Sequence, residues 1–467
     1  MAPAAARALR VLLALAGASS AAADIYFPQM IHLSLTGQDG EMAVDWISSC
    51  PDGSSAVTFA DNPAHTNATS APGVDHASAY VDLHMTHTNY TLHYALMTGL
   101  RPGTTYYYKV GCSNMSSQAL SFQSFPPADR EPIWAAYGDM GLGVDTWREL
   151  APSIPVLAQE AQAGEFDGII HAGDYAYDFA VDEGRVGDRF MNAIQPFASK
   201  VPYMGAVGNH ECGGGNRMHY SRRFAGFNFA ARNSKAKPAG SFNSGDNMWY
   251  SWDAGLIHFV TVNTEAWNCP NMDPTKGMGS GNCVWNPTTN RSLADEFLEW
   301  FEADLEAANV PAQRAKVPWV VMYAHKAFYM QPGTNFSAID DLAHAHGVDL
   351  HIAGHVHIYQ RFFPLRSSPY GPNASNPNNQ PADWDHGCAT ELPDGAGNTY
   401  TNPKYMTQIV AGSPGDIEVT SDSNAAFPNG AAEPGSGPGS CNGLTTNVSI
   451  DKPIAACRAN YGERDDQ

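Results

Sequence analysis

The sequence predicts an all-β sandwich over residues 24–127 followed by an α/β domain over residues 128–420, in which helices flank β-sheets. Three observations lead to this prediction. A chain of 467 residues is too long for one compact core. Residues 24–127 alternate between apolar and polar side chains and carry turn residues at regular intervals, which is typical of a sandwich. From Ile133 onward, apolar runs end in Gly-Asp or Gly-Asn pairs and alternate with helical patterns, which is typical of an α/β core.

Residues 1–23 have the pattern of a signal peptide. Arg7 and Arg10 precede the apolar residues 11–16, and the small residues 19–23 resemble an Ala-x-Ala cleavage site. The apolar segment is too short to span a bilayer, and no later stretch is long enough either. We therefore expect a soluble mature protein in the secretory pathway, either extracellular or in a vacuole or lysosome.

The cysteines and glycosylation sequons fit this oxidising compartment. Of the eight cysteines, Cys50 and Cys112 fall in the predicted sandwich and Cys269 and Cys283 bracket a short loop, so we expect both pairs to form disulfides. The sequence leaves open the partners of Cys212, Cys388, Cys441 and Cys457. Asn-x-Ser/Thr sequons behind a signal peptide predict a glycoprotein. They begin at Asn67, Asn89, Asn114, Asn290, Asn335, Asn373 and Asn447.

The net charge of −21 argues against nucleic acids and anionic membranes as partners, because the field of the protein would repel both. The sequence leaves the oligomeric state open. Residues 366–404 are rich in Pro, Asn and Gly and predict a long surface loop, whereas residues 421–467 are rich in Gly, Pro, Ser and Ala and predict an irregular tail.

Within the first domain, residues 42–47 and 105–110 are examples of predicted strands. Residues 100–106, Leu-Arg-Pro-Gly-Thr-Thr-Tyr, resemble the tyrosine corner of fibronectin type III domains. We expect this domain to be a packing module without chemistry of its own. Residues 125–130 form the linker to the second domain.

Apolar segments of the second domain are predicted strands that lead directly into polar residues. They are 133–137 before Asp139, 168–172 before Asp174, 201–207 before Asn209 and His210, 317–323 before His325, and 348–353 before Gly354, His355 and His357. A capping box from Ser292 to Asp295 predicts a helix to about Leu305, and residues 405–412 predict one more strand. We expect Gly354 to let the backbone turn sharply, so that both histidines after it project into one cavity.

The polar residues after these strands are a candidate ligand set for metals, because ligands bind beyond the carboxyl ends of the strands in α/β sheets. The set is Asp139, Asp174, Tyr177, Asn209, His210, His325, His355 and His357. Carboxylates, a phenol, a carboxamide and imidazoles suit a pair of first-row metals better than Ca²⁺ or a zinc thiolate site.

Five short blocks that contain these residues resemble those of the purple acid phosphatases, which are calcineurin-like metallophosphoesterases. The blocks are Asp139-Met140-Gly141, Gly173-Asp174-Tyr175-Ala176-Tyr177, Gly208-Asn209-His210-Glu211, Met322-Tyr323-Ala324-His325 and Gly354-His355-Val356-His357. The resemblance covers about residues 25–420 and includes the fibronectin-like leader of larger family members. Tyr177 separates this family from most other metallophosphoesterases.

The resemblance implies an acid phosphatase that hydrolyses phosphate monoesters by attack of a metal-bound hydroxide at a dinuclear Fe(III)–M(II) centre. It implies an Fe³⁺ site made of Asp139, Asp174, Tyr177 and His357. It implies a second site for Zn²⁺, Mn²⁺ or Fe²⁺ made of Asp174, Asn209, His325 and His355. His210 would face the leaving oxygen as a general acid or hydrogen-bond donor, and Glu211 would either orient His210 or have a structural role.

The chain departs from the family pattern after the fourth and fifth blocks. Lys326-Ala327-Phe328-Tyr329 stands where family members often have Arg-Pro-Met-Tyr or a His-containing stretch, so the resemblance covers the metals but not the substrate pocket. Ile358-Tyr359-Gln360-Arg361 replaces the usual Ala-Tyr-Glu-Arg. The family usually closes with a strand after a Tyr-Gly pair, so we expect the tail after Tyr461-Gly462 to be truncated or divergent.

Two alternative functions remain open at this point. The first is a metal-dependent phosphodiesterase or nucleotidase of the same superfamily, and Tyr177 argues against it. The second is a secreted binding protein built on an inactive enzyme domain, and the complete ligand set argues against it.

Overall fold

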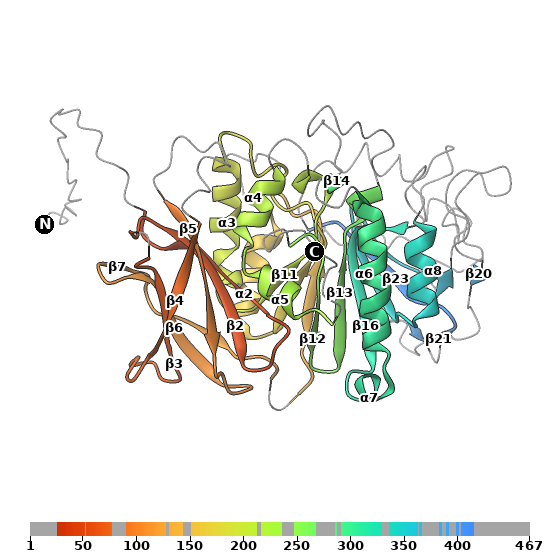
Figure 1. Cartoon of the computed structure of the whole chain (residues 1–467), viewed down its shortest axis with the longest axis horizontal. Coiled ribbons are helices and arrows are strands. Elements are labelled where there is room, and N and C mark those ends of the chain that lie inside the picture. The colour runs from red at the N-terminus through yellow and green to blue at the C-terminus, as the bar shows by residue number, and fades with distance from the viewer. Residues whose placement is uncertain are drawn as a thin grey trace, which may run out of the picture.

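The structure is a computed structural model of the whole chain (Figure 1). It describes residues 26–51, 53–76, 90–127, 130–142, 151–212, 216–235, 247–267, 285–286, 291–328, 336–362, 364–366, 383–384, 389–391, 398–400 and 403–414. Several predictions fall outside these residues: the signal peptide, the pair Cys269 and Cys283, the cysteines 388, 441 and 457, the C-terminal tail, and every sequon except those at Asn67 and Asn114.

The N-terminal domain is a sandwich of two antiparallel sheets, which confirms the first half of the predicted fold class. Strand β4 belongs to both sheets, because its residues 69–72 pair with β3 and its residues 73–76 pair with β5. One sheet therefore has the order β1-β2-β5-β4 and the other β4-β3-β6-β7, with β8 also paired to β6. The strands are β1 Gln29–Ser34, β2 Glu41–Ser48, β3 Ala56–Ala60, β4 Thr69–His76, β5 Thr91–Thr98, β6 Thr105–Cys112, β7 Met115–Ser116 and β8 Leu120–Gln123.

Two local features of the sandwich agree with the sequence. The phenol oxygen of Tyr106 accepts a hydrogen bond from the backbone N–H of Arg101 at 3.1 Å, which is the contact of a tyrosine corner. The predicted disulfide between Cys50 and Cys112 is present. Cys212, in the second domain, is a free thiol.

The second domain contains a three-stranded parallel sheet and a six-stranded mixed sheet, which confirms the α/β half of the predicted fold class. The strand orders are β11-β10-β9 and β12-β13-β16-β17-β23-β18, and the two outer strands of the larger sheet run antiparallel to their neighbours. The N–H of Gly138 donates to the carbonyl of Ala411 at 2.9 Å, so the carboxyl ends of β9 and β23 meet. These strands are β9 Trp134–Tyr137, β10 Gly168–His171, β11 Tyr203–Gly205, β12 Ser251–Ala254, β13 Ile257–Val262, β16 Trp319–Lys326, β17 Leu350–Gly354, β18 Tyr359–Arg361 and β23 Thr407–Ala411.

Helices flank these sheets, with α2 beside α3 and α6 beside α8 (Figure 1). Helix α6 begins directly after Ser292, as the capping box predicts, and continues three residues past Leu305. The helices are α2 Ser153–Ala163, α3 Arg185–Ala198, α4 Asn216–Arg223, α5 Phe227–Asn233, α6 Leu293–Ala308, α7 Pro311–Arg314 and α8 Ser337–Ala345, with 3₁₀ turns η1 Asn209–Glu211 and η2 Thr264–Trp267. Further two-stranded antiparallel sheets pair β14 Trp285–Asn286 with β15 Arg291–Ser292, β19 Leu365–Arg366 with β20 Asp383–Trp384, and β21 Ala389–Glu391 with β22 Asn398–Tyr400. Within the described part of the chain, no helix has the length and apolarity needed to cross a membrane.

Buried polar contacts join the two domains. Helix α3 of the second domain packs on β1 of the sandwich. The phenol of Tyr90, at the start of β5, donates to Oδ1 of Asp188 in α3 at 2.6 Å, and Nη2 of Arg223 donates to the same oxygen at 2.7 Å. Tyr108 of β6 donates to the carbonyl of Ser199 after α3 at 2.6 Å. The sandwich therefore supports α3, the helix that follows the segment with Tyr177 in the chain.

Candidate metal centre

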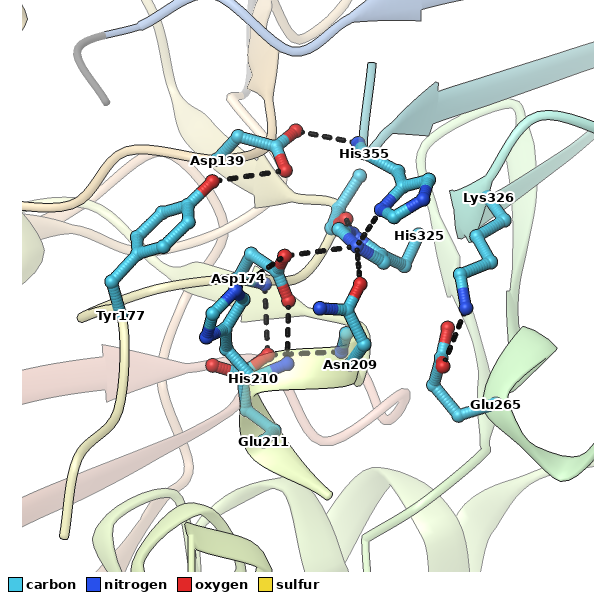
Figure 2. Close-up of polar contacts among 12 residues, drawn as sticks. Asp139, Asp174, Tyr177, Asn209, His210, Glu211, Glu265, His325, Lys326 and His355 are labelled. Atoms are coloured by element: carbon cyan, nitrogen blue, oxygen red, sulfur yellow. Dashed lines mark hydrogen bonds and ion pairs between the residues drawn. The ribbon is translucent and has the colours of Figure 1, made fainter. Parts of the chain in front are cut away.

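The ends of five strands bring the predicted site residues together, and Figure 2 labels all of them except His357. Asp139 follows β9, Asp174 and Tyr177 follow β10, Asn209 and His210 follow β11, and His355 and His357 follow β17. His325 differs from the prediction, because it lies inside β16 rather than on a loop after it. The pairing of β16 with β17 shifts register between Ala324 and Lys326, so a bulge in the strand presents His325 to the site.

The backbone that holds these side chains is in a sparsely populated conformation. Asp139, Asp174, Tyr177 and His355 all have positive φ angles, of 62°, 55°, 51° and 69°. The sharp turn after β17 is thus made by His355, not by Gly354 as the sequence suggested. Gly354 is required for another reason: a Cβ there would collide with Oδ2 of Asp139. Strain of this kind clusters at functional sites, where the surrounding packing enforces it.

His325 is the centre of the first cluster of donor atoms. Its Nδ1 lies 2.9 Å from the carbonyl oxygen of Ala172, and because a carbonyl can only accept, Nδ1 carries the hydrogen. In the neutral ring, Nε2 then presents a lone pair to the site. Around this nitrogen lie Asn209 Oδ1 at 2.9 Å, Asp174 Oδ2 at 3.1 Å and His355 Nδ1 at 3.1 Å.

This cluster fits a divalent metal ion. The ligand atoms of Asp174, His325 and His355 all lie within 4.8 Å of one another. Lone pairs of an imidazole, a carboxylate and an amide oxygen that face one another at such distances repel unless a proton or a metal ion lies between them. A carboxylate, an amide oxygen and two imidazoles suit a borderline divalent ion such as zinc.

A second cluster adjoins the first and consists of Asp139, Tyr177 and His357. The phenol oxygen of Tyr177 lies 2.8 Å from Nε2 of His357 and 3.4 Å from Oδ1 of Asp139. Nε2 of His357 lies 3.5 Å from the same carboxylate oxygen. Oδ2 of Asp139 accepts a hydrogen bond from the backbone N–H of His355 at 2.7 Å, which ties this cluster to the first.

His210 stands at the side of both clusters and is partly exposed. Its ring lies against Tyr177, with the ring centroids 4.5 Å apart. Its Nδ1 lies 3.3 Å from Oδ1 of Asp178, and its Nε2 lies 4.0 Å from Oδ2 of Asp174. Asp178 therefore orients the ring of His210.

The sequence leaves two roles open for Glu211, which are to orient His210 or to support the structure. The hydrogen bonds of Glu211 show the structural role. Its buried carboxylate accepts hydrogen bonds from the backbone N–H groups of Asp174 at 2.8 Å, Tyr175 at 3.0 Å and Gly208 at 2.9 Å. These bonds join the loop after β10 to the turn after β11. Glu211 thus fixes the two loops that carry Asp174 and Asn209 relative to each other.

The electrostatics of the site favour a bound cation. Burial would raise the pKa of Asp174, but the charges of His325, His210 and His355 hold this pKa below its ordinary value. Burial would likewise lower the pKa of His325, but Asp174 raises it to about 9. The same negative field that holds a proton on His325 would attract a metal ion, and binding of the metal would displace that proton. Burial and the charge of His325 lower the pKa of His355, so its ring stays neutral, as a ligand requires.

The sequence did not reveal two contacts of this site. The first is the contact of Asp178 with His210. Asp178 directly follows Tyr177, but nothing in the sequence around it predicts its positive φ of 82°. The buried pair of Lys326 with Glu265 was not foreseen either, because the two residues are 61 positions apart in the chain.

The comparisons with known proteins agree with this architecture. Residues 28–124 match the family described as purple acid phosphatase, N-terminal domain, and residues 135–359 match the calcineurin-like phosphoesterases. The chain is 29% identical to acid phosphatase type 7 of Mus musculus over 410 residues, which cover 84% of this chain and 79% of that protein. It is 26% identical to purple acid phosphatase 21 of Arabidopsis thaliana over 359 residues, which cover 74% and 70% of the two chains.

A solved structure supports the same fold. The purple acid phosphatase PPD1 from seeds of yellow lupin superposes with a TM-score of 0.55 at 20% identity, and the match covers 84% of this chain and 65% of that one. The fold and the site thus define a metallophosphoesterase that carries an N-terminal β-sandwich. More specifically, the chain belongs to the purple acid phosphatases, because it matches the model of their N-terminal domain and, after it, the model of the calcineurin-like phosphoesterases.

Proposed function

We propose that this protein, as a phosphoric monoester hydrolase of the purple acid phosphatase family, hydrolyses phosphate monoesters at acidic pH at a centre of two metal ions. Asp139, Tyr177 and His357 would hold Fe³⁺ together with Asp174. Asp174 would also hold a divalent ion, Zn²⁺, Mn²⁺ or Fe²⁺, together with Asn209, His325 and His355. We further propose a location in the secretory pathway, outside the cell or in a vacuole or lysosome.

The observation that carries the proposal is the arrangement around Nε2 of His325. Its other ring nitrogen is committed to the carbonyl of Ala172, so a carboxylate oxygen, an amide oxygen and a second imidazole nitrogen converge on Nε2, where a metal ion could replace a proton. When bound there, a pair of metal ions would supply the Lewis acidity that activates water and neutralises the charge of the phosphate.

The chain's own residues would position the substrate and assist the leaving group. Nδ1 of His210 is held by Asp178, so its Nε2 is available to donate to the oxygen of the departing alcohol. Burial would lower the pKa of His210, but the hydrogen bond to Asp178 raises it, and this bond favours the protonated ring that such a donor needs. The backbone N–H of His210 donates to Oδ1 of Asp174 at 2.9 Å, which fixes the donor relative to the carboxylate that both metals would share.

Metal analysis combined with kinetics tests this function. We expect the purified protein to contain iron and one divalent metal per chain and to hydrolyse an aryl phosphate monoester faster than the corresponding diester. The Asp174→Ala variant should lose both metals together, whereas His325→Ala should lose mainly the divalent ion. Faster hydrolysis of the diester would favour a phosphodiesterase. An iron-loaded protein without activity on either substrate would favour a binding protein on an inactive enzyme domain.

A further inference from the structure

Lys326, the residue after His325, forms a buried ion pair with Glu265 beside the metal centre (Figure 2). Nζ of Lys326 lies 2.8 Å from Oε2 of Glu265, and the two residues are only 3% and 0% exposed. Burial of either charge without a partner would be strongly unfavourable. The pair is therefore an integral part of this region of the fold.

The strand arrangement places this pair beside the imidazoles of the candidate divalent site. Glu265 lies in η2, directly after β13, and β13 runs parallel to β16 as far as the pairing of Val262 with Ala324. The backbone N–H of Lys326 donates to Oγ1 of Thr264 at 3.2 Å. On its other side, Lys326 pairs with Gly354, the residue before His355.

The pair also lies next to the candidate ligands. Lys326 directly follows His325 in β16, and Figure 2 shows the side chains of Lys326 and Glu265 to one side of the rings of His325 and His355. An ammonium in this position would repel a divalent cation, since interactions between charges are strong where water is excluded.

We propose that Glu265 is a positioning residue of the divalent site, which anchors Lys326 and cancels its charge so that a cation can bind at His325 and His355. This inference rests on the proposed metal assignment. It gives a function to the stretch after His325, where the chain departs from the purple acid phosphatase pattern. Glu265 would not touch the metal or the substrate, and its effect would act through the imidazoles and the charge of Lys326.

A double-mutant cycle tests the proposal through the affinity for Zn²⁺. The full-length protein is stripped of metal, and the dissociation constant of Zn²⁺ is measured by competition with a chromogenic chelator for the wild type, Glu265→Gln, Lys326→Met and the double variant. We expect Glu265→Gln to weaken Zn²⁺ binding by about 10–100-fold, because an uncompensated ammonium remains beside the site. Lys326→Met should leave the affinity unchanged or increase it, and the double variant should recover most of the wild-type affinity.

The opposite effects of the two single variants separate charge compensation from simple structural support. If both single variants weaken Zn²⁺ binding equally and the double variant does not recover, the proposal is wrong. If Glu265→Gln does not yield folded protein, Lys326→Met decides alone, because weaker Zn²⁺ binding by that variant contradicts the proposal. Lys326→Arg keeps the charge and should bind Zn²⁺ like the wild type.

Two controls complete the experiment. Lys235→Met removes a lysine that is paired with Asp253 at 2.6 Å outside the metal centre, and it should leave the affinity for Zn²⁺ unchanged. His325→Ala should abolish binding at the divalent site. If the wild type shows no Zn²⁺ binding that depends on His325, the metal assignment fails and this inference fails with it. If that binding is present but the cycle shows no opposite effects, only the role of Glu265 is wrong.

Discussion

The phenol oxygen of Tyr177 lies 2.8 Å from Nε2 of His357, although the two residues are 180 positions apart in the chain. The positive φ of Tyr177 turns its side chain toward the end of β17, where His357 lies beside the carboxylate of Asp139. A phenol, an imidazole and a carboxylate therefore meet at one point, next to the cluster around His325. This arrangement supports the proposal that a trivalent ion binds at Tyr177.

The Tyr177→Phe variant should lose the visible absorption band of the iron-loaded protein. A phenolate bound to Fe³⁺ transfers charge to the metal and absorbs visible light, and the phenol ionises only because the metal drives its pKa far below the usual value of about 10. Phe keeps the ring that packs against His210, so the domain should stay folded. The measurement is a visible spectrum with iron content determined in parallel. A colourless wild type with full iron content, or a coloured variant, would show that Tyr177 is not a ligand.

The His210→Ala variant should keep its metals and lose turnover by about 10²–10⁴-fold, the usual range for a lost general acid. The loss should be larger for an alkyl phosphate than for an activated aryl phosphate, because the aryl oxygen leaves without needing a proton. Rates for both substrates, normalised to metal content, give the comparison. Equal losses on the two substrates would point to a role in substrate binding instead of leaving-group assistance.

The candidate ligands could be predicted from the sequence because each lies within a few residues of a strand end. In an α/β fold, the carboxyl ends of parallel strands meet at one edge, so short motifs such as Gly173-Asp174 or Gly208-Asn209 are enough to place side chains together. The same argument placed His325 on a loop after its strand instead of within β16, because a bulge inside β16 does not follow from the apolar pattern of that strand.

The contacts around the ligands could not be predicted, because they depend on strand order and on backbone angles. Glu265 meets Lys326 only because β13 lies beside β16, and nothing local in either segment specifies that neighbour. Asp178 reaches His210 only through its positive φ. The sequence therefore indicated which candidate ligands come together, but not the residues that orient them.

Replacement of His258 by Gln should destabilise the protein more at pH 5 than at pH 9. His258 is buried, with Nδ1 2.7 Å from Asp253 and Nε2 2.9 Å from Asp304. Burial would lower its pKa, but the two carboxylates raise it, and in turn His258 lowers the pKa of Asp253 against the effect of burial. Because the pKa of His258 is raised in the folded protein, its charged pairs stabilise the fold fully below the pKa of an unfolded histidine, about 6.5. This stabilisation disappears as the pH rises through the pKa of His258 in the folded protein.

The lowered pKa of Asp253 sets the acidic limit of this stabilisation. The contribution of Asp253 to stability is complete above the pKa of an unfolded aspartate, about 3.9, and is lost as the pH falls through the lower pKa of Asp253 in the folded protein. Melting temperatures of the wild type and the variant from pH 4 to 9 provide the measurement. His351→Gln is the control with the opposite sign: burial lowers the pKa of His351 to about 4, so the native histidine reduces stability as the pH falls below about 6.5. A difference between wild type and His258→Gln that does not change with pH would exclude the charged pair.

The Arg223→Leu variant should lower the free energy of unfolding by about 3–5 kcal/mol, because removal of one partner of a buried ion pair leaves the other uncompensated. Arg223 is 2% exposed, and its guanidinium holds Asp188, which also accepts from Tyr90 of the sandwich. Tyr90→Phe removes only a neutral donor and should cost about 1 kcal/mol. Urea denaturation of each variant provides the values.

Arg185→Leu is the matched control, because Arg185 forms a solvent-exposed pair with Asp182 and should change stability by less than about 1 kcal/mol. If Arg223→Leu is as mild as this control, the stability of the protein does not depend on the buried ion pair between Arg223 and Asp188.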